Sequence, residues 1–279
     1  MQATLEHIRT ELAGIYNKTD METVCRALCL ELLEIPQTDY WLKSNLQPDS
    51  SREARLDAAL ARLKQDEPLQ YVLGCTLFCG LTFKVGPGVL IPRPETAELV
   101  EWVAEYCTGR NGRLLDIGCG SGCISVTLAS KLKGWNVTGW DISDTALETS
   151  SANAKTNGVN VWFEKHDILQ ESGNGFKFSV IVSNPPYVTC SEKAEMERNV
   201  LEYEPGLALF VPDNDPLLFY KAIAAFGFDA LEKGGRLFFE INPLFSVQMA
   251  DMLAGMGYSD IAIKTDISGR QRMMSAVLI

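Results

Sequence analysis

The chain has 279 residues, of which 46% are hydrophobic and 22% are charged, a composition typical of a globular protein with one large domain and one small one. Its formal net charge of -11 argues against a protein whose affinity comes from neutralising many phosphates. No apolar run of about 18 residues predicts a membrane span, and the start lacks a basic region followed by an apolar stretch. We therefore expect a cytoplasmic protein that does not bind a membrane.

Apolar residues at helical spacing predict a small helical bundle over residues 1–70. Capping-box patterns at 19–22 and 50–53 predict the starts of two helices, and residues 39–43 predict a short helical piece between them. The first helix is indicated by four apolar residues at 3-4-3 spacing: Leu5, Ile8, Leu12 and Ile15.

After the bundle, the apolar residues change from helical spacing to the alternation that is typical of a β-strand. Leu81 and Phe83 alternate with polar residues between glycines, which predicts a β-hairpin linker over residues 71–92. A helix is expected over residues 95–107, and beyond it strands and helices alternate. This alternation predicts an α/β fold with a mostly parallel, doubly wound sheet in a domain over residues 93–279. The predicted strands cover residues 113–117, 136–140, 161–165, 178–183, 236–241 and 260–265, with a last one near 273–278.

The first of these strands runs into a glycine-rich turn, Asp116-Ile117-Gly118-Cys119-Gly120-Ser121-Gly122. Glycine is needed where a ligand approaches the backbone closely or where φ is positive. The spacing differs from the G-x-G-x-x-G fingerprint of dinucleotide-binding folds. On its own, the turn is also explained by close packing of the strand against the next helix.

Two acids follow the next two strands. Asp141 ends the second strand, where an acid can accept both hydroxyls of a ribose. Asp167 follows the third strand and could hold an adenine amino group. Each acid alone is also compatible with a turn or a helix cap, and Asp141 could open the helix that follows Ser143. Because the carboxyl ends of parallel strands meet at one edge, the two acids and the glycine turn together favour a cofactor site.

The fourth strand, residues 178–183, stops at Asn184-Pro185-Pro186-Tyr187. Proline cannot donate to a β-ladder and restricts the residue before it, so the strand ends here at the same edge of the sheet. Asn-Pro alone is typical of a turn. Beside the glycine turn and Asp141, however, it predicts one half of a site for two ligands.

Eight cysteines are spread along the chain, and three pairs of them lie four residues apart. This spacing would place two thiols on one helix face. Structural zinc sites favour closer pairs and often use histidine, of which the chain has two. We therefore expect no metal site and interpret the cysteines as small core residues kept reduced.

These motifs resemble the S-adenosylmethionine-dependent methyltransferases of the seven-stranded class that modify amino or amide nitrogens. Four segments closely resemble the release-factor glutamine methyltransferase family, and the resemblance extends over nearly the whole chain. It implies a Rossmann-like sheet of seven strands, preceded by a helical domain that holds the protein substrate and by the hairpin linker. The four segments are Pro68-Leu-Gln-Tyr-Val-Leu-Gly74, Ile91-Pro-Arg-Pro-Glu-Thr96, Val182-Ser-Asn-Pro-Pro-Tyr187 and Tyr203-Glu-Pro-Gly-Leu-Ala-Leu209.

The resemblance implies transfer of a methyl group from S-adenosylmethionine, leaving S-adenosylhomocysteine, to N5 of the glutamine in the Gly-Gly-Gln motif of class I peptide chain release factors. It implies a cofactor site made of Asp116, Ile117, Gly118, Cys119, Gly120, Asp141, Asp167, Ile168 and Asn184. It implies an acceptor site made of Asn184, Pro185, Pro186 and Tyr187, in which Asn184, Pro185 and Tyr187 are catalytic. Some family members have an aromatic residue at the position of Ile168, so aliphatic packing would replace stacking on the adenine.

Other assignments stay open. The closest is a glutamine methyltransferase that acts on a ribosomal protein, and next is a nucleic-acid amino methyltransferase, which the acidic balance disfavours. A non-catalytic module that binds the cofactor and a partner would have no need of an intact Asn-Pro-Pro-Tyr, and the glycine spacing disfavours a nicotinamide dehydrogenase. Five glutamates after the acceptor motif are typical of a solvated surface, and as a hypothesis they form an acidic rim that receives a basic substrate loop: Glu192, Glu195, Glu197, Glu202 and Glu204.

Overall fold

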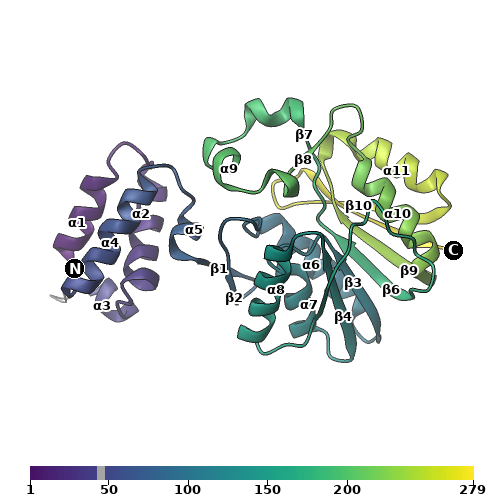
Figure 1. Ribbon diagram of the computed structural model, residues 1–279, viewed down its shortest axis with the longest axis horizontal. Helices are drawn as coiled ribbons and strands as arrows, with labels where there is room; N and C mark the ends of the chain where they lie inside the picture. The colour runs from purple at the N-terminus through teal and green to yellow at the C-terminus, as the bar shows by residue number, and fades with distance from the viewer. Residues whose placement is uncertain (43–47) are drawn as a thin grey trace. The chain divides into compact units, whose positions relative to one another are not determined.

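The computed structural model describes residues 1–42 and 48–279. These residues form two compact units (Figure 1). The smaller unit comprises Met1–Cys75 and Glu197–Tyr203, and the larger comprises Thr76–Met196 and Glu204–Ile279. Among the described residues, no helix is both long enough and apolar enough to cross a membrane.

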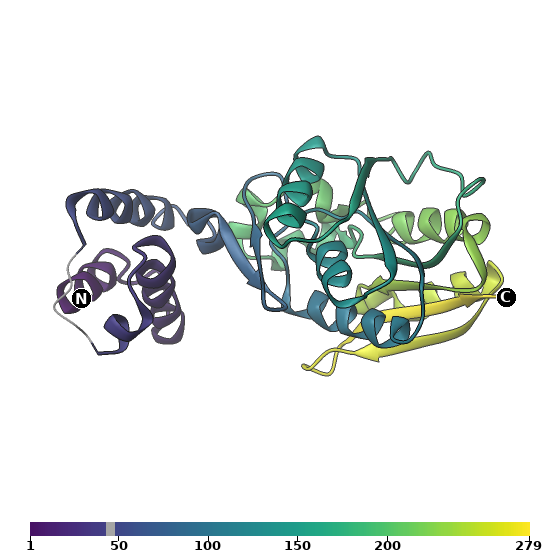
Figure 2. The same cartoon turned by 90° about the horizontal axis from the view of Figure 1, so that it is seen from below.

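The smaller unit consists of short helices packed around an apolar core (Figure 2). The first helix ends at Glu11, earlier than predicted, and Ile15 is 38% exposed rather than buried. The Tyr203 hydroxyl donates to the Gln65 carbonyl oxygen at 2.7 Å, which fixes the segment Glu197–Tyr203 beside the end of α4 (Ser50–Leu63). Lys43, at the end of the predicted piece 39–43, lies outside the described residues. The helices are α1 (Gln2–Glu11), α2 (Lys18–Ala27) with a π-helical continuation (Leu28–Leu32), α3 (Gln37–Trp41), α4 (Ser50–Leu63), α5 (Leu69–Leu73) and α9 (Arg198–Tyr203).

The two helices are present, but their predicted N-cap residues, Thr19 and Ser50, are wrong. Helix α2 begins after Asn17, whose Oδ1 accepts the Asp20 backbone N–H at 3.0 Å. Helix α4 begins after Asp49, whose Oδ1 accepts the Arg52 backbone N–H at 2.9 Å. Asn and Asp are among the strongest N-caps, and each stands upstream of the predicted start, so its side chain satisfies the free N–H groups of the first turn.

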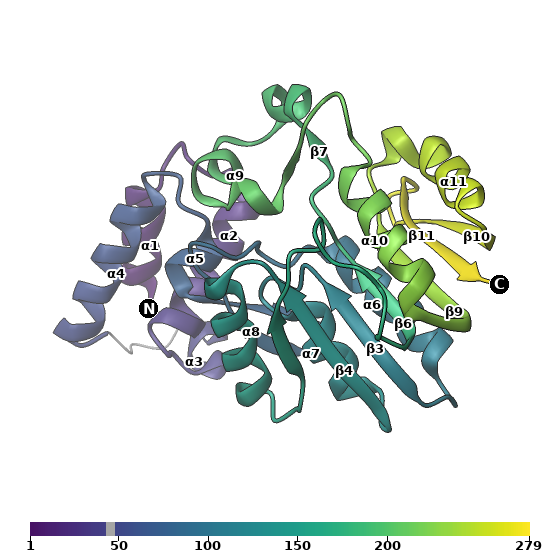
Figure 3. The same ribbon diagram turned by 45° about the vertical axis from the view of Figure 1, so that its right-hand side comes forward.

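A seven-stranded sheet forms the centre of the larger unit (Figure 3) and confirms the predicted fold class. The strand order is β10-β11-β9-β6-β3-β4-β5. Strands β9, β6, β3, β4 and β5 are parallel, whereas β11 runs antiparallel to β9 and β10. All seven predicted strands are present: β3 (Gly112–Ile117), β4 (Trp135–Asp141), β5 (Trp162–Lys165), β6 (Phe178–Ser183), β9 (Leu231–Glu240), β10 (Tyr258–Thr265) and β11 (Gln271–Leu278).

Helices cover both faces of this sheet, because successive side chains of a strand point to opposite faces. Leu114 and Val180 belong to one buried apolar cluster, whereas their neighbours Leu115 and Ile181 belong to another. The first cluster is completed by α6 (Pro94–Cys107), α7 (Cys123–Lys131) and α8 (Asp144–Thr156), and the second by α10 (Leu218–Ala230) and α11 (Ser246–Gly255). The sheet and the helices on its two faces therefore form three layers.

Two small two-stranded sheets accompany the large one. The predicted hairpin is present as β1 (Cys75–Phe78) and β2 (Leu81–Lys84). Asn153 of α8 donates to the Lys84 carbonyl oxygen at 3.0 Å and accepts the Lys84 N–H at 2.7 Å, which fixes the hairpin to the larger unit. The second small sheet, which the sequence did not predict, consists of β7 (Val188–Thr189) and β8 (Phe210–Val211), with 3-10 turns at Cys190–Glu195, Gly206–Ala208 and Pro243–Phe245.

Candidate active site

The glycine-rich turn continues β3 at the carboxyl edge of the sheet. The backbone N–H groups of Gly118 and Cys119 both donate to the Trp140 carbonyl oxygen, at 2.8 and 3.0 Å, and hold the turn against the end of β4. Gly118 and Gly120 have φ values of 74° and 55°, which favour glycine. A Cβ added at either position would meet no atom within 4 Å. These two glycines leave the open space that a ligand close to the backbone would need.

The third glycine of the turn has a different surrounding. Gly122 has a φ of 78°, and a Cβ added there would lie 2.9 Å from the Ser150 Cβ. It therefore lets the start of α7 pack closely against α8. Helix packing therefore explains Gly122, whereas ligand approach stays a prediction for Gly118 and Gly120.

Asp116 is fully buried beneath this turn, with an exposed fraction of 0%. Its Oδ2 accepts the Ser125 backbone N–H at 3.0 Å, whereas its Oδ1 has no hydrogen-bond partner among the described residues. Burial raises the pKa of this carboxyl from 3.8 to about 7, and nearby Asp141 adds to the effect. A buried carboxylate oxygen without a partner is costly, so a cationic or N–H group of a ligand would suit this position.

Asp141 holds the glycine turn and the start of α8 together. Its Oδ2 accepts the Gly120 N–H and its Oδ1 accepts the Ser143 N–H, both at 2.9 Å, and Ser143 caps α8. Each carboxylate oxygen has a second lone pair left for a ligand hydroxyl. Burial raises the pKa of Asp141, while the backbone N–H donors oppose that rise. The proposed ribose role and the alternative structural role are therefore compatible in one side chain.

Asp167 lies after β5 in a turn that it stabilises itself. Its Oδ1 accepts the Leu169 N–H at 3.0 Å, and its Oδ2 accepts from the Gln170 side-chain amide at 2.6 Å. Ile168 is half-buried against the apolar cluster that includes α10. The contact of these two residues with an adenine stays a prediction.

The predicted acceptor motif, residues 184–187, follows β6, between the ends of β3 and β9. Asn184 is half-buried and Pro185 is buried, and both line a pocket. Apolar side chains form much of its wall, and Arg93 and Glu240 are its charged members. The pocket is lined by Leu90, Arg93, Asn184, Pro185, Tyr187, Val188, Ala208, Leu209 and Glu240.

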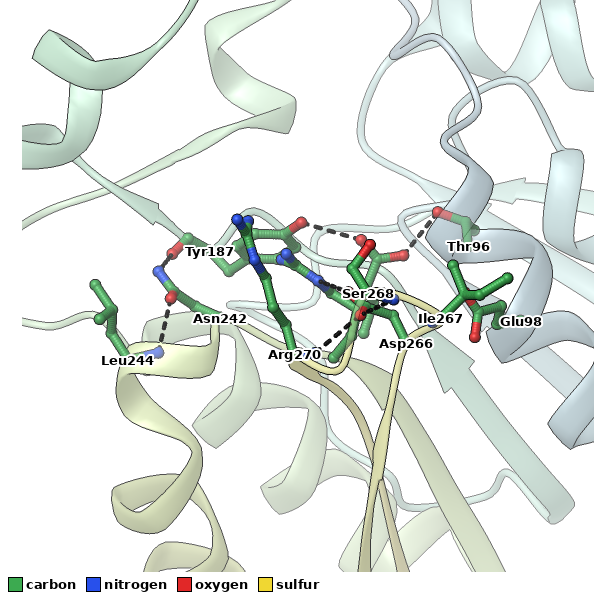
Figure 4. A network of polar contacts seen from close by, with 11 residues as sticks. Thr96, Glu98, Tyr187, Asn242, Leu244, Asp266, Ile267, Ser268 and Arg270 are labelled. Atoms are coloured by element: carbon green, nitrogen blue, oxygen red, sulfur yellow. Dashed lines mark hydrogen bonds and ion pairs between the residues drawn. The ribbon is translucent and has the colours of Figure 1, made fainter.

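A polar network joins residues of this pocket to Thr96 and Asn242, and Figure 4 shows part of it. The Tyr187 hydroxyl donates to Glu240 Oε1 at 3.0 Å, and the Thr96 hydroxyl donates to Glu240 Oε2 at 2.6 Å. Asn184 Nδ2 donates to Thr96 Oγ1 at 3.2 Å. Asn242 Nδ2 donates to the Tyr187 carbonyl oxygen at 3.1 Å, which fixes the last residue of the motif.

The sequence reasoning did not identify Thr96, Glu240 or Asn242 as members of the site. Thr96 stood within a segment used for the family resemblance, and Glu240 is an acid at the end of the apolar run of β9. That acid was a usable signal, because an ionisable residue seldom ends a buried strand unless it has a partner. Asn242 had no comparable signal, since an asparagine after a strand is typical of a turn.

The hypothesis of an acidic rim is corrected for two of its five glutamates. Glu204 is 5% exposed, accepts the Ile91 N–H at 3.0 Å and pairs with Arg93 at 2.5 Å. Glu192 accepts the Thr189 N–H at 2.8 Å and contacts Asn242. Both acids therefore stabilise the walls of the pocket. The three others are exposed.

Comparisons with known proteins agree with this arrangement. Family models described as "PrmC N-terminal domain" and "Methyltransferase small domain" match residues 3–74 and 95–202. A release factor glutamine methyltransferase of Bacteroides thetaiotaomicron is 41% identical over 277 residues, 99% of each chain, and one of Flavobacterium psychrophilum is 40% identical over 267 residues, 94% of each. A solved methyltransferase of Pyrococcus furiosus has a TM-score of 0.51 at 19% identity, covers 82% of this chain and 98% of its own, and shows the same fold. The chain belongs to the release factor glutamine methyltransferase family.

Proposed function

We propose that this protein transfers a methyl group from S-adenosylmethionine to N5 of the glutamine in the Gly-Gly-Gln motif of class I peptide chain release factors. The observation that carries the proposal is the pocket at Asn184 and Pro185, in a chain that is 41% identical over nearly its full length to a release factor glutamine methyltransferase. The helical unit is proposed to hold the release factor.

The residues at the carboxyl edge fit the proposed cofactor. Asp116 Oδ1 lacks a partner among the described residues and suits the ammonium group of the methionine moiety. The space over Gly118 and Gly120 suits a chain lying along the turn, and the remaining lone pairs of Asp141 suit the two ribose hydroxyls. Asp167 and Ile168 are proposed to flank the adenine. When bound, the cofactor supplies a methyl group activated by a positively charged sulfur.

The acceptor pocket explains how a poor nucleophile could be used. The nitrogen of a glutamine amide carries a lone pair that is delocalised into the carbonyl group. If Asn184 Oδ1 and the Pro185 carbonyl oxygen each accept one N–H, the amide is oriented and its lone pair can face the methyl group. The same two oxygens favour the positive charge that develops on nitrogen in the transition state.

Tyr187 and the apolar wall complete this proposed pocket. The pKa of Tyr187 is raised by burial, so the phenol stays protonated and offers a flat surface to the planar amide. Leu90 and Leu209 line the same pocket and give it an apolar wall. No strong base is required before transfer, because methylation acidifies the nitrogen and water can then take the proton.

Incubation with labelled S-adenosylmethionine tests the proposal. The protein is given, in separate reactions, a class I release factor, the same factor with its Gly-Gly-Gln glutamine changed to alanine, a preparation of ribosomal proteins, and DNA. Label is expected on the unchanged release factor alone. Label on a ribosomal protein or on DNA, with none on the release factor, would overturn the assignment.

A further inference from the structure

Glu240 is a buried carboxyl group at the acceptor pocket that has no part in the chemistry assigned to Asn184 and Pro185. It ends β9, lines the pocket and is 1% exposed. Its two oxygens accept from the hydroxyls of Thr96 and Tyr187. Placing an ionisable group in a dry site is costly, so its contacts with the acceptor motif call for an explanation.

The hydrogen bonds around Glu240 have a fixed direction. An ionised carboxylate can only accept, so the single proton of the Thr96 hydroxyl points to Glu240 Oε2. Thr96 Oγ1 can then only accept from Asn184, which lies at 3.2 Å. Asn184 must therefore turn its Nδ2 toward Thr96, and its Oδ1 lies on the opposite branch of the planar amide.

We propose that Glu240 and Thr96 are positioning residues that set the orientation of the Asn184 amide, so that its oxygen and not its nitrogen is offered to the acceptor. This inference rests on the proposed function, because only an acceptor amide requires that choice. A flipped Asn184 would offer an N–H donor, which matches the carboxylate of a glutamate better than the N–H groups of a glutamine. The relay thus also determines which side chain the pocket selects.

Opposing influences act on the ionisation of Glu240. Burial is the largest of them and raises the pKa of this carboxyl. The hydrogen bonds that Thr96 and Tyr187 donate to its two oxygens, and the positive charge of Arg272, oppose that rise and favour the ionised form. Arg272 of β11 forms an ion pair with Asp266 at 3.6 Å. Asp266 lies in the turn between β10 and β11 (Figure 4).

Thr96→Val tests the relay, because valine keeps the shape of threonine and removes the hydroxyl. We expect kcat for release factor methylation to fall about 10- to 100-fold, because Asn184 loses the hydrogen bond that sets the orientation of its amide. The affinity for S-adenosylmethionine should stay unchanged. Thr96→Ser should restore kcat to near the wild-type value. Thr127→Val is the matched control, since Thr127 is 1% exposed and its hydroxyl has no partner among the described residues.

Peptide binding provides a readout that a purely structural role would not move. Two loop peptides that differ only in Gly-Gly-Gln against Gly-Gly-Glu are titrated in the presence of S-adenosylhomocysteine. The wild type should prefer the glutamine peptide, and Thr96→Val should lose most of that preference. Glu240→Gln should lose part of it, because its amide can donate to Thr96 Oγ1 and reverse the relay. It also carries the test if Thr96→Val does not fold.

The outcomes separate this inference from the proposed function. A wild-type protein that leaves the release factor unlabelled removes the function, and the inference with it. A wild type that methylates the release factor, with Thr96→Val or Glu240→Gln matching Thr127→Val in kcat and in peptide preference, overturns the relay alone. Loss of activity that Thr96→Ser does not restore also overturns it.

Discussion

Replacing Asp116 by asparagine is expected to stabilise the ligand-free protein at pH 8. The Asp116 carboxyl is 0% exposed, and its pKa is raised from 3.8 to about 7 by burial. At about 1.36 kcal/mol per pKa unit, ionisation of this group costs the folded protein about 4 kcal/mol relative to the unfolded chain. Asparagine removes that cost, and its Oδ1 can still accept the Ser125 N–H.

Part of this gain is offset by the new amide. Its NH₂ group would occupy the position of the unpartnered Asp116 Oδ1, and burying a donor without an acceptor costs about 1–3 kcal/mol. The net expectation is therefore a stabilisation of about 1–3 kcal/mol at pH 8. Because the folded pKa is the higher one, the folded wild type binds the proton more tightly, and its stability falls as the pH rises from about 4 to 7. The gain in stability of Asp116→Asn over the wild type should therefore shrink as the pH is lowered from about 7 to 4.

Urea unfolding at pH 8 and pH 4.5, with and without S-adenosylmethionine, measures these effects. The variant should have the higher midpoint at pH 8 and little or no advantage at pH 4.5. It should also bind the cofactor more weakly, since the proposed contact with the ammonium group loses its negative charge. A variant that is less stable than the wild type at pH 8, or a difference that is equal at both pH values, would refute the reasoning.

Three further variants test other parts of the site. Asn184→Ala should largely abolish single-turnover methylation while cofactor binding stays measurable, and a wild-type rate would contradict the assigned role. Asp141→Ala should weaken S-adenosylmethionine binding about tenfold or more by calorimetry, because two loop N–H groups and the ribose lose their acceptor; unchanged affinity would exclude the ribose role. Glu204→Ala should lower the free energy of unfolding by about 2–3 kcal/mol, since it leaves the Ile91 N–H and half-exposed Arg93 without a partner. Thermal unfolding with an unchanged midpoint would show that the ion pair contributes nothing.

The sheet and the edge at which ligands would meet were predictable from local pattern. Apolar runs such as residues 178–183 marked the strands, and their alternation with helices indicated a parallel sheet. Because the carboxyl ends of parallel strands meet at one edge, this pattern was enough to place the glycine turn, Asp141 and Asn184 near one another. Residues whose role depends on distant partners were not predictable in this way. Glu204 has the composition of a surface residue, and only its pairing with Arg93, 111 residues earlier, makes it part of the core. The same holds for Thr96 and Glu240, which are 144 residues apart.

Asp116 and Glu240 lie on the same face of the sheet, toward the carboxyl ends of their strands. Asp116 stands two residues after Leu114, and Glu240 two residues after Phe238, and both apolar residues belong to the cluster under α6, α7 and α8. Each acid thus replaces the last apolar side chain of a buried stripe at the edge of the sheet. One is adjacent to the proposed cofactor turn and the other to the acceptor motif. Burial raises the pKa of both carboxyls, so a negative charge on either one lowers the stability of the folded protein. A bound cation at the cofactor turn should recover part of that stability, so the proposed cofactor should stabilise the protein more at pH 8 than at pH 5.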